Sequence, residues 1–460
     1  MKKMAGFCMA FSMALYMHTF VFSDALKGAA LSLEDIRLSA LANSRSLARY
    51  NLAIESGLLD EKAQNFTYLP SLSLTGSALT QLWNAGGGSP LDSLVAGGSL
   101  EISETLPVYE GGKAKILKAI NALSTESARK DALAEYYAVL NAADSAYYAV
   151  LKAQANLESA ESALAATELT LAASHIRYEN EMIRYGDYLQ ALSEKESAAA
   201  AKKQAERNLA VNMANLKNIA GMPETPVLAP VDFSKRESLI LYCTNLDEDD
   251  INALCLNLWR IMMTNNPELA KAGISLQKAE KNVDLAAKDY LPSVSASVST
   301  GLDYNYQYGK SNAPSPFTGS LSIKVSVPLD FWVIKNKVDK QKLSQEHARL
   351  EYLDSVSSTH IEMQSAILDL ILQAGTVISS RRAYEYAQKH FEYIEELYQL
   401  EQKSLSDYYD ASNQAHNSLN KCIDAQYDFL LALSKIRSLG AFEREEDVFA
   451  FLLAGRNNGE

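Results

Sequence analysis

The side chains that could perform catalysis or hold a metal ion are scattered along this sequence. None of its 6 histidines has a second histidine three or four residues away, the spacing at which two imidazoles on one helix face share a metal ion. The sequence also has no Gly-x-Ser-x-Gly nucleophile motif, no phosphate-binding loop and no Cys-x-x-Cys pair. These residues therefore predict no helical metal site and no cofactor motif, and each histidine is expected to lie on the surface or in a helix seam.

One pair of carboxylates has a spacing that could serve a function. Asp407 and Asp410 are three residues apart, so both can project from one face of a helix. Asp407 also ends a Ser-x-x-Asp sequence that begins at Ser404, which is typical of the capping box at a helix N-terminus. From these residues alone, a charged functional site and a structural cap both stay open.

The elements that would position such residues begin after an N-terminal targeting segment. Lys2 and Lys3 precede an apolar stretch, and Val21 and Ser23 fit the −3 and −1 positions of a signal-peptidase site. Residues 1–23 are therefore predicted to be a secretory signal peptide. Cleavage after Ala25 and an uncleaved membrane anchor are the alternatives.

Three cysteines follow this segment, namely Cys243, Cys255 and Cys422. An odd number at irregular spacing does not form a disulfide framework. A bond between Cys243 and Cys255 stays possible in an oxidising compartment.

The composition indicates long helices and an acidic surface. The 460 residues carry a net charge of −13, which disfavours nucleic-acid binding. Mean hydropathy is −0.13, and after the N-terminus no run of 18 apolar residues occurs, so helical membrane spans are not expected. Residues 108–222 and 329–460 contain no proline, which favours long uninterrupted helices.

The chain is a tandem repeat. Residues 43–73 recur at 265–295 with an offset of 222, and residues 178–191 recur at 398–411 with an offset of 220. Each half is one unit of about 220 residues, far longer than a solenoid repeat. The predicted organisation is a signal peptide at 1–23, a first repeat at 24–222, a linker at 223–250, a second repeat at 251–439 and a C-terminal segment at 440–460.

Each half contains two predicted strands, in hairpins at about 68–107 and about 290–328. Apolar and polar residues alternate along these segments, which indicates strands with one apolar and one polar face. The polar faces carry mostly Ser, Thr, Asn and Gln rather than charged residues, and about 10–12 residues suffice for a tilted strand to cross a membrane. Transmembrane strands are therefore favoured over a soluble sandwich that buries one face.

Tyrosines gather at one end of a predicted strand, at Tyr304, Tyr306 and Tyr308. Aromatic side chains are enriched where a membrane strand meets the lipid–water interface. We predict that these three residues belong to an interfacial aromatic girdle.

The helical segments match one another in length. Lys113–Tyr178 would form a helix of roughly 99 Å, and its apolar residues follow a coiled-coil spacing. Two helices of half that length, at 31–66 and 184–220, could lie end to end beside it. The second half repeats this set, with one long helix at 335–398 and shorter helices at 251–288 and 404–438.

Four membrane strands in one chain require a partner. Strand edges facing lipid leave N–H and C=O groups without hydrogen bonds, so a membrane sheet must close into a barrel, and known bacterial barrels start at about eight strands. A dimer would supply about eight strands and a trimer about twelve, and both satisfy closure.

Several motifs together resemble one known family. They are the repeated Tyr-Leu-Pro-Ser-x-Ser at 68–73 and 290–295, Leu106–Lys113, Val327–Trp332, and Tyr178–Ala191 with its repeat Tyr398–Ala411. In this order, over essentially the whole mature chain, they resemble the TolC-like outer membrane efflux proteins.

This resemblance implies an α+β membrane protein that forms a homotrimer. Three chains would share a 12-stranded barrel in contact with outer-membrane lipid and continue as an α-helical coiled-coil tunnel through the periplasm. Such proteins are exit ducts that work with a periplasmic adaptor and an inner-membrane transporter, in efflux or type I secretion, and have no enzymatic activity.

The resemblance also implies roles for particular residues. Asp407 and Asp410 match positions that line the closed periplasmic aperture, where threefold symmetry would gather six carboxylates. Asp187, Tyr398 and Lys403 match positions that tie neighbouring helices together and hold the aperture shut.

The turns between helices would contact the adaptor. The matching residues are Asn180, Glu181, Met182, Ile183, Leu400, Glu401 and Gln402. Here the sequence departs from the family, because Glu181 and Glu401 stand where glycine is usual, and glutamate adopts a positive φ only at a cost. Either the turn has another geometry, or the helices continue and turn nearby.

A second function class fits the same patterns. A periplasmic or surface scaffold could combine the helical bundle with a soluble β-layer. It would differ from a duct in leaving the cell as a soluble protein and in conducting no ions.

Overall fold

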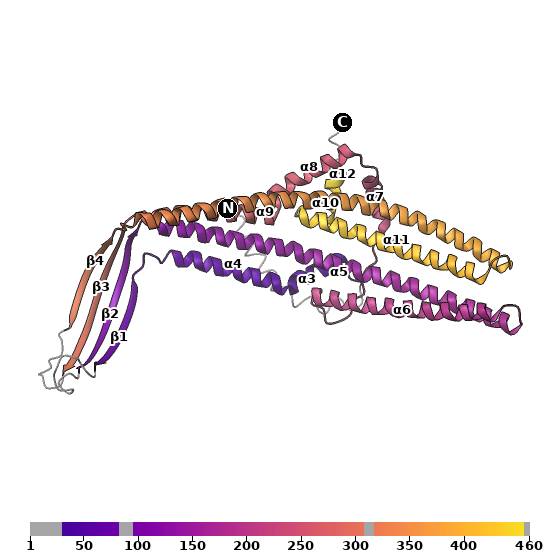
Figure 1. Ribbon diagram of the computed structural model, residues 1–460, viewed down its shortest axis with the longest axis horizontal. Coiled ribbons are helices and arrows are strands. Elements are labelled where there is room, and N and C mark those ends of the chain that lie inside the picture. Colours follow the sequence, from indigo (N-terminus) through magenta and orange to yellow (C-terminus); the bar gives the residue numbers. More distant parts are fainter. Residues whose placement is uncertain (1–29, 82–94, 308–316, 455–460) are drawn as a thin grey trace. The chain divides into compact units, whose positions relative to one another are not determined.

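A computed structural model of the chain describes residues 30–81, 95–307 and 317–454, and Figure 1 shows its elements. In chain order these are α3 (Leu33–Asn43), α4 (Arg45–Gln64), β1 (Ser71–Gln81), β2 (Val95–Glu110), α5 (Lys113–Glu179), α6 (Tyr185–Ala220), η1 (Phe233–Arg236), α7 (Glu237–Thr244), α8 (Glu248–Asn265), α9 (Pro267–Ala287), η2 (Lys288–Tyr290), β3 (Ser293–Gln307), β4 (Thr318–Ser326), α10 (Phe331–Gln399), α11 (Leu405–Leu439) and α12 (Glu445–Ala454).

These elements form two compact units. The first unit joins the chain up to residue 49 with residues 131–270 and the chain from residue 356. The second unit joins residues 50–130 with residues 271–355. Each unit therefore combines corresponding parts of the two predicted repeats.

The predicted long helices are confirmed at nearly the expected limits. α5 has 67 residues and α10 has 69, and each is followed by a helix about half as long. The absence of proline and the abundance of alanine in α5 favour helices of this length.

The two shorter helices that precede the hairpins differ from their predictions. The segment 31–66 breaks at Ser44 into α3 and α4, and the segment 251–288 breaks at Asn266 into α8 and α9. Pro267 explains the second break, because it disfavours helical backbone at the preceding residue. The Asn266 side chain then caps the next helix by accepting hydrogen bonds from two backbone N–H groups, at 2.9 and 3.2 Å.

The second unit contains all four predicted strands, paired antiparallel in the order β1-β2-β3-β4 (Figure 1). Their register places serines side by side across the whole sheet, in the row Ser73, Ser103, Ser299 and Ser320. Hydroxyl oxygens in this row lie 2.7 Å apart between β1 and β2 and 2.9 Å apart between β3 and β4. The polar face of the sheet thus carries pairs of hydroxyl groups that bond to each other within each hairpin.

The opposite face of the sheet is apolar and exposed. Leu72 in β1 is 75% exposed and Ile323 in β4 is 72% exposed. Glu104 shares this face but pairs with Leu72, next to the start of β1, where a membrane strand would leave the hydrocarbon. Every residue of β4 is exposed, so no layer of the described chain covers either face of that strand. A soluble sandwich would bury one face, whereas a membrane sheet presents its apolar face to lipid.

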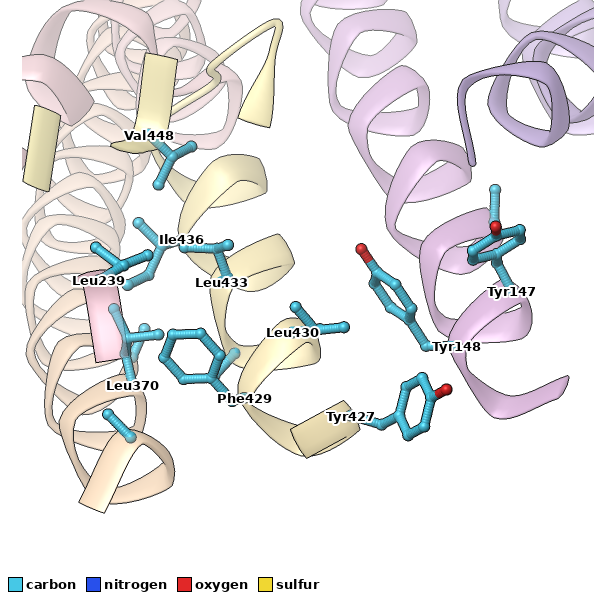
Figure 2. Packing of buried hydrophobic residues seen from close by; sticks show 14 of the residues in the cluster. Tyr147, Tyr148, Leu239, Leu370, Tyr427, Phe429, Leu430, Leu433, Ile436 and Val448 are labelled. Carbon is cyan, nitrogen blue, oxygen red and sulfur yellow. The ribbon is translucent and has the colours of Figure 1, made fainter. Parts of the chain in front are cut away.

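The core of the first unit lies among its helices, and Figure 2 shows part of it. The labelled side chains come from α5, α7, α10, α11 and α12, and are Tyr147, Tyr148, Leu239, Leu370, Tyr427, Phe429, Leu430, Leu433, Ile436 and Val448. Among the described residues, α10 alone is long and apolar enough by composition to cross a membrane. A core helix passes the same test, and α10 buries Met363, Ile367 and Leu370 in this cluster.

The three described cysteines are free thiols, so the possible bond between Cys243 and Cys255 is not formed. Cys243 lies in the core on α7, and burial raises its pKa to about 12. Its thiol therefore stays protonated at neutral pH and packs as a small apolar group.

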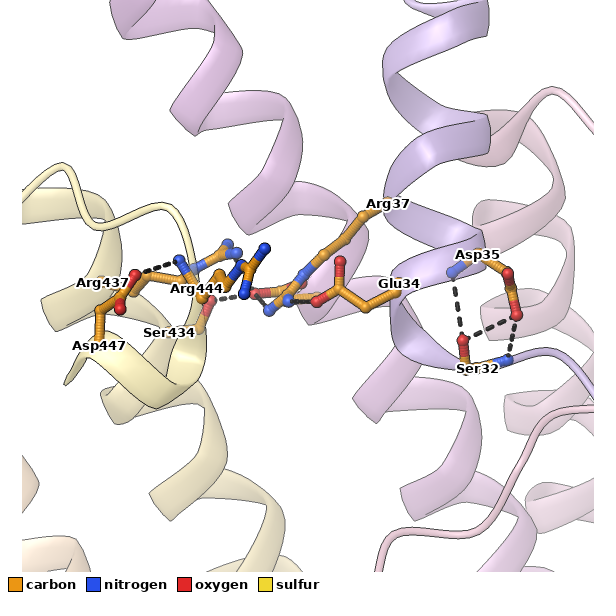
Figure 3. Close-up of polar contacts among 9 residues, drawn as sticks. Ser32, Glu34, Asp35, Arg37, Ser434, Arg437, Arg444 and Asp447 are labelled. Carbon is orange, nitrogen blue, oxygen red and sulfur yellow. Dashed lines mark hydrogen bonds and ion pairs between the residues drawn. The ribbon is translucent and has the colours of Figure 1, made fainter. Parts of the chain in front are cut away.

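A buried carboxylate joins three helices of this unit (Figure 3). Asp144 on α5 is 0% exposed and accepts hydrogen bonds from Arg37 of α3, at 2.6 and 2.9 Å. It also accepts from Arg437 and Ser434 of α11, at 2.8 and 2.5 Å. Burial by itself would lower the pKa of Arg37, but the hydrogen bonds and charge of Asp144 raise it overall.

Replacing this carboxylate should destabilise the protein strongly. Asp144→Ala leaves two buried guanidinium groups without their shared acceptor, and breaking a buried pair costs about 3–5 kcal/mol. The measurement is thermal unfolding followed by the far-ultraviolet dichroism of the helices in detergent.

The control is Glu346→Ala, which removes an exposed ion pair to Arg349 and should leave the unfolding temperature nearly unchanged. Equal unfolding temperatures for the two variants would contradict a structural role for Asp144.

Candidate functional site at the helix hairpin turns

The turns that connect α5 to α6 and α10 to α11 have the same geometry. Glu181 and Glu401 both have a φ of 60°, in the left-handed region. In the first turn, the N–H groups of Glu181 and Met182 donate to the carbonyls of Tyr178 and Arg177, at 2.9 and 2.8 Å. This pair of bonds is the Schellman motif, which usually has glycine at its left-handed position.

The second turn repeats these bonds in full. The N–H groups of Glu401 and Gln402 donate to the carbonyls of Tyr398 and Leu397, at 3.0 and 2.9 Å. The sequence predicted either a turn of another geometry or helices that continue and turn nearby. Both predictions are wrong, because each glutamate itself adopts the left-handed conformation that glycine usually has in this turn. The backbone hydrogen bonds of the motif hold it there against the steric cost of a Cβ atom.

Glycine at these two positions should stabilise the protein. Glu181→Gly and Glu401→Gly each relieve a left-handed glutamate, which costs about 1 kcal/mol relative to glycine. Thermal unfolding of the purified protein measures the gain.

Glu396→Gly is the matched control, since it places glycine inside α10 and should destabilise by about 1 kcal/mol. A lower unfolding temperature for the turn variants would show that the glutamate side chains make stabilising contacts.

The predicted gate carboxylates begin the return helices. Asp407 closes a capping box with Ser404, in which each backbone N–H donates to the other side chain at 3.1 Å. Asp187 accepts from the N–H of Arg184 at 3.3 Å in the first repeat. Hydrogen bonds from the Ser404 hydroxyl and backbone lower the pKa of Asp407, so this cap weakens only as the pH falls below the usual range of a carboxyl.

The other predicted gate residues differ in whether they contact Asp407. Lys403 forms an ion pair with Asp407 at 3.9 Å, and Asp410 is exposed. Among the described residues, no hydrogen bond or ion pair joins Asp187 to Tyr398 or Lys403. Their role in closing an aperture stays a prediction.

Tyr398 instead belongs to an aromatic cluster. The guanidinium carbon of Arg177, on α5, lies 5.2 Å from the centre of the Tyr398 ring on α10. On the other side, the Tyr408 ring of α11 lies 5.2 Å from that of Tyr398. A cation over an aromatic face is attracted by the ring quadrupole. The Arg177 contact therefore connects the two helix hairpins.

The sequence patterns did not lead to a prediction for Arg177, although the repeat contains a feature that points to this region. Tyr178 and Tyr188 are the counterparts of Tyr398 and Tyr408, and their rings stack at 5.3 Å. The repeat thus preserves an aromatic pair, and Arg177 directly precedes its first member. The buried Tyr409 completes the contact between hairpins by packing with Ala191 of α6, and burial raises its pKa.

The predicted aromatic girdle is only partly described. Tyr304 and Tyr306 lie in β3, and Tyr308 lies outside the described residues. A second group of exposed aromatics, missed from the sequence, lies where the strands meet the helices. Its members are Phe66, Tyr68, Tyr109, Tyr290, Phe331 and Trp332.

No group of His, Cys, Asp or Glu side chains in the described ranges could hold a metal ion.

Comparison with known proteins identifies the family. The profile of the outer membrane efflux proteins matches residues 37–222 and 260–440. This chain belongs to the outer membrane efflux protein family. The TolC-like resemblance is thereby confirmed: the protein is a non-enzymatic transport channel of the outer membrane with a periplasmic tunnel.

Relatives agree with this assignment. Outer membrane protein TolC of Vibrio cholerae is 24% identical over 318 residues, which cover 66% of this chain and 67% of TolC. The CmeC outer membrane channel of Campylobacter jejuni superposes with a TM-score of 0.71 at 15% identity, over 93% of this chain and 90% of CmeC. The open MtrE channel of Neisseria gonorrhoeae gives a TM-score of 0.67 at 16% identity, over 89% and 88%.

Proposed function

We propose that three copies of this chain form an exit duct of a tripartite efflux or type I secretion system. The duct would pass drugs, other small molecules or proteins from an inner-membrane transporter and its periplasmic adaptor to the exterior. The observation that carries assembly of several copies is the four-stranded sheet with an exposed apolar face, because its end strands β1 and β4 need partners in lipid. Three chains supply about twelve strands, which leave a lumen for transport.

Exposed apolar residues on α10 support packing between copies. Ile361 is 65% exposed, and Leu368 follows it after seven residues. Further along α10, 18 residues after Leu368, the exposed Tyr386 and Tyr393 are again seven residues apart. A stripe of apolar residues with a seven-residue period is the seam of a coiled coil. In a trimer this stripe would pack against a helix of the neighbouring copy.

The periplasmic end of the duct would be gated by carboxylates. Asp407 and Asp410 lie three residues apart on α11, and threefold symmetry would place six carboxylates around one aperture. Such a ring attracts cations. Capping and gating are compatible, because Asp407 caps its helix through one oxygen and keeps about half of its side chain exposed.

Removing these carboxylates should weaken block by multivalent cations. The block is measured as the concentration of a trivalent cation that halves the bilayer conductance. In the double variant Asp407→Ala with Asp410→Ala, this concentration should rise roughly tenfold, since all six charges are lost. Conductance of the purified protein in planar bilayers is also the test of the duct itself.

Ser404→Ala is the control, because it removes the cap hydroxyl and keeps every carboxylate. If Ser404→Ala weakens the block equally, the effect comes from helix fraying and the gate is refuted. A protein that is released by osmotic shock as a soluble species and conducts no ions would refute the duct.

The contact between Arg177 and Tyr398 would hold the two hairpins together in the closed state. Arg177→Ala and Tyr398→Ala should increase the basal conductance by several-fold or more, because both partners are half-buried and a cation–π contact contributes about 0.5–2 kcal/mol in each of three copies. Tyr398→Phe keeps the aromatic face and should behave like the unaltered protein.

If Tyr398→Phe instead opens the channel as fully as Tyr398→Ala, the hydroxyl rather than the ring face is what holds the hairpins. Asp187 and Lys403 would contribute further polar links in the same closed state.

The adaptor would contact the two hairpin turns. The residues there are Asn180, Glu181, Met182, Ile183, Leu400, Glu401 and Gln402. Glu181 and Glu401 are exposed and form no ion pair within the described chain. A strained backbone conformation that carries a charged side chain is often kept for function. The turns would therefore suit an adaptor tip with basic side chains.

A further inference from the structure

The junction between the sheet and the helices has a charge opposite to that of the chain as a whole. Three segments of the second unit meet there, at residues 108–118, 288–291 and 329–342. They contain eight lysines and four carboxylates, a net charge of +4 in a chain of net charge −13. The lysines are Lys113, Lys115, Lys118, Lys288, Lys335, Lys337, Lys340 and Lys342.

Part of this positive charge is neutralised by an internal contact. Asp289 forms ion pairs with Lys113, at 2.6 Å, and with Lys337. Burial alone would raise the pKa of Asp289, but its hydrogen bonds to these two lysines lower it overall. This contact fixes the starts of α5 and α10 to the segment that precedes β3.

Three further lysines have ammonium groups that are available to a partner. Lys115, Lys335 and Lys340 are exposed, and none of them takes part in an ion pair of the described chain. We call these three residues the lysine collar. Lys115 lies near the start of α5, and Lys335 and Lys340 lie near the start of α10, so their ammonium groups give this junction a positive charge that anions would favour.

Aromatic side chains lie between this collar and the strands. Trp332 is 69% exposed at the start of α10, and the neighbouring Phe331 ring lies 6.3 Å from that of Tyr290. Lys335 follows Phe331 by four residues and Trp332 by three, so it lies on the same face of α10. Before them, β4 exposes Ile323 and Val325.

The order along this surface is therefore an apolar strand face, then aromatic rings, then ammonium groups. A bilayer leaflet has the matching order of hydrocarbon, interface and phosphate headgroup. Because the helices of this family lie in the periplasm, the matching leaflet is the periplasmic one. Lysine is suited to this position, since its flexible stem packs on apolar surface while the ammonium reaches the headgroups.

We propose that the lysine collar binds the phosphate groups of anionic phospholipids in the periplasmic leaflet of the outer membrane. The collar would fix the depth of the protein in the bilayer and surround it with acidic lipid. The inference rests on the outer-membrane placement and on closure of the barrel with its apolar strand face outward.

Trp332 provides a reporter for the lipid next to the collar. With Trp83→Phe and Trp259→Phe it is the sole tryptophan, and bromine atoms on lipid acyl chains quench its fluorescence on contact. The protein is reconstituted in vesicles that contain phosphatidylcholine and phosphatidylglycerol, with one or the other brominated. We expect stronger quenching by brominated phosphatidylglycerol, which gives the relative binding constant of the two lipids.

Neutralising the collar should abolish this preference. With Lys115→Gln, Lys335→Gln and Lys340→Gln together, the relative binding constant should fall by about fivefold for each lysine removed. Arginine at the same three positions should retain it. Lys203→Gln, Lys389→Gln and Lys421→Gln form the matched control, because they remove the same charge from exposed lysines elsewhere on the chain and should leave the preference intact.

Equal quenching by both lipids in the unaltered protein would overturn the proposal, and so would an equal loss of preference in the matched control. Bilayer conductance of the same samples separates this result from failure of the duct. Normal conductance without a lipid preference would refute only the collar. Absence of conductance in the unaltered protein would refute the duct on which it rests.

Discussion

The hydrogen-bonding requirement of backbone in lipid governs this protein. The sheet exposes its apolar face, and it ends at β1 and β4, whose outer N–H and C=O groups find no water in a bilayer. One chain cannot meet that requirement with four strands. The need for further strands, supplied by other copies of the chain, follows from it. In the proposed closed barrel, the row of serine hydroxyls would lie on the face opposite the lipid and would line the water-filled lumen.

The return helix α11 has different constraints at its two ends. Near its C-terminus, Arg437 and Ser434 bond to the buried Asp144, which leaves little freedom for the helix to move there. At its N-terminus, the chain passes through the strained Glu401 and the exposed capping box of Asp407. Buried ion pairs are costly to break, whereas exposed caps and cation–π contacts are weak. The helix is therefore held firmly near its C-terminus and weakly at its N-terminus.

Asp407 has one observed role within a single chain and a second, proposed role in the assembly. Within a single chain its carboxylate is a helix cap, bonded to Ser404 and close to Lys403. The proposed ring of carboxylates would be a property of three chains, and it would arise only when symmetry brings copies together. The proposed role of the lysine collar likewise depends on more than a single chain, because its ligand would be a component of the membrane.

The sequence by itself determined the elements of this protein. Proline-free stretches predicted α5 to within one residue and α10 to within four, alternation predicted all four strands, and the repeat predicted that both halves have the same parts. Tertiary structure alone decided which faces meet. Asp144 bonds to residues 107 and 293 positions away, and Arg177 covers a ring 221 residues later in the chain. The left-handed glutamates are a further case, since local preference favours glycine there. Periodicity describes one element and its own faces, whereas contacts between distant elements depend on how the whole chain packs.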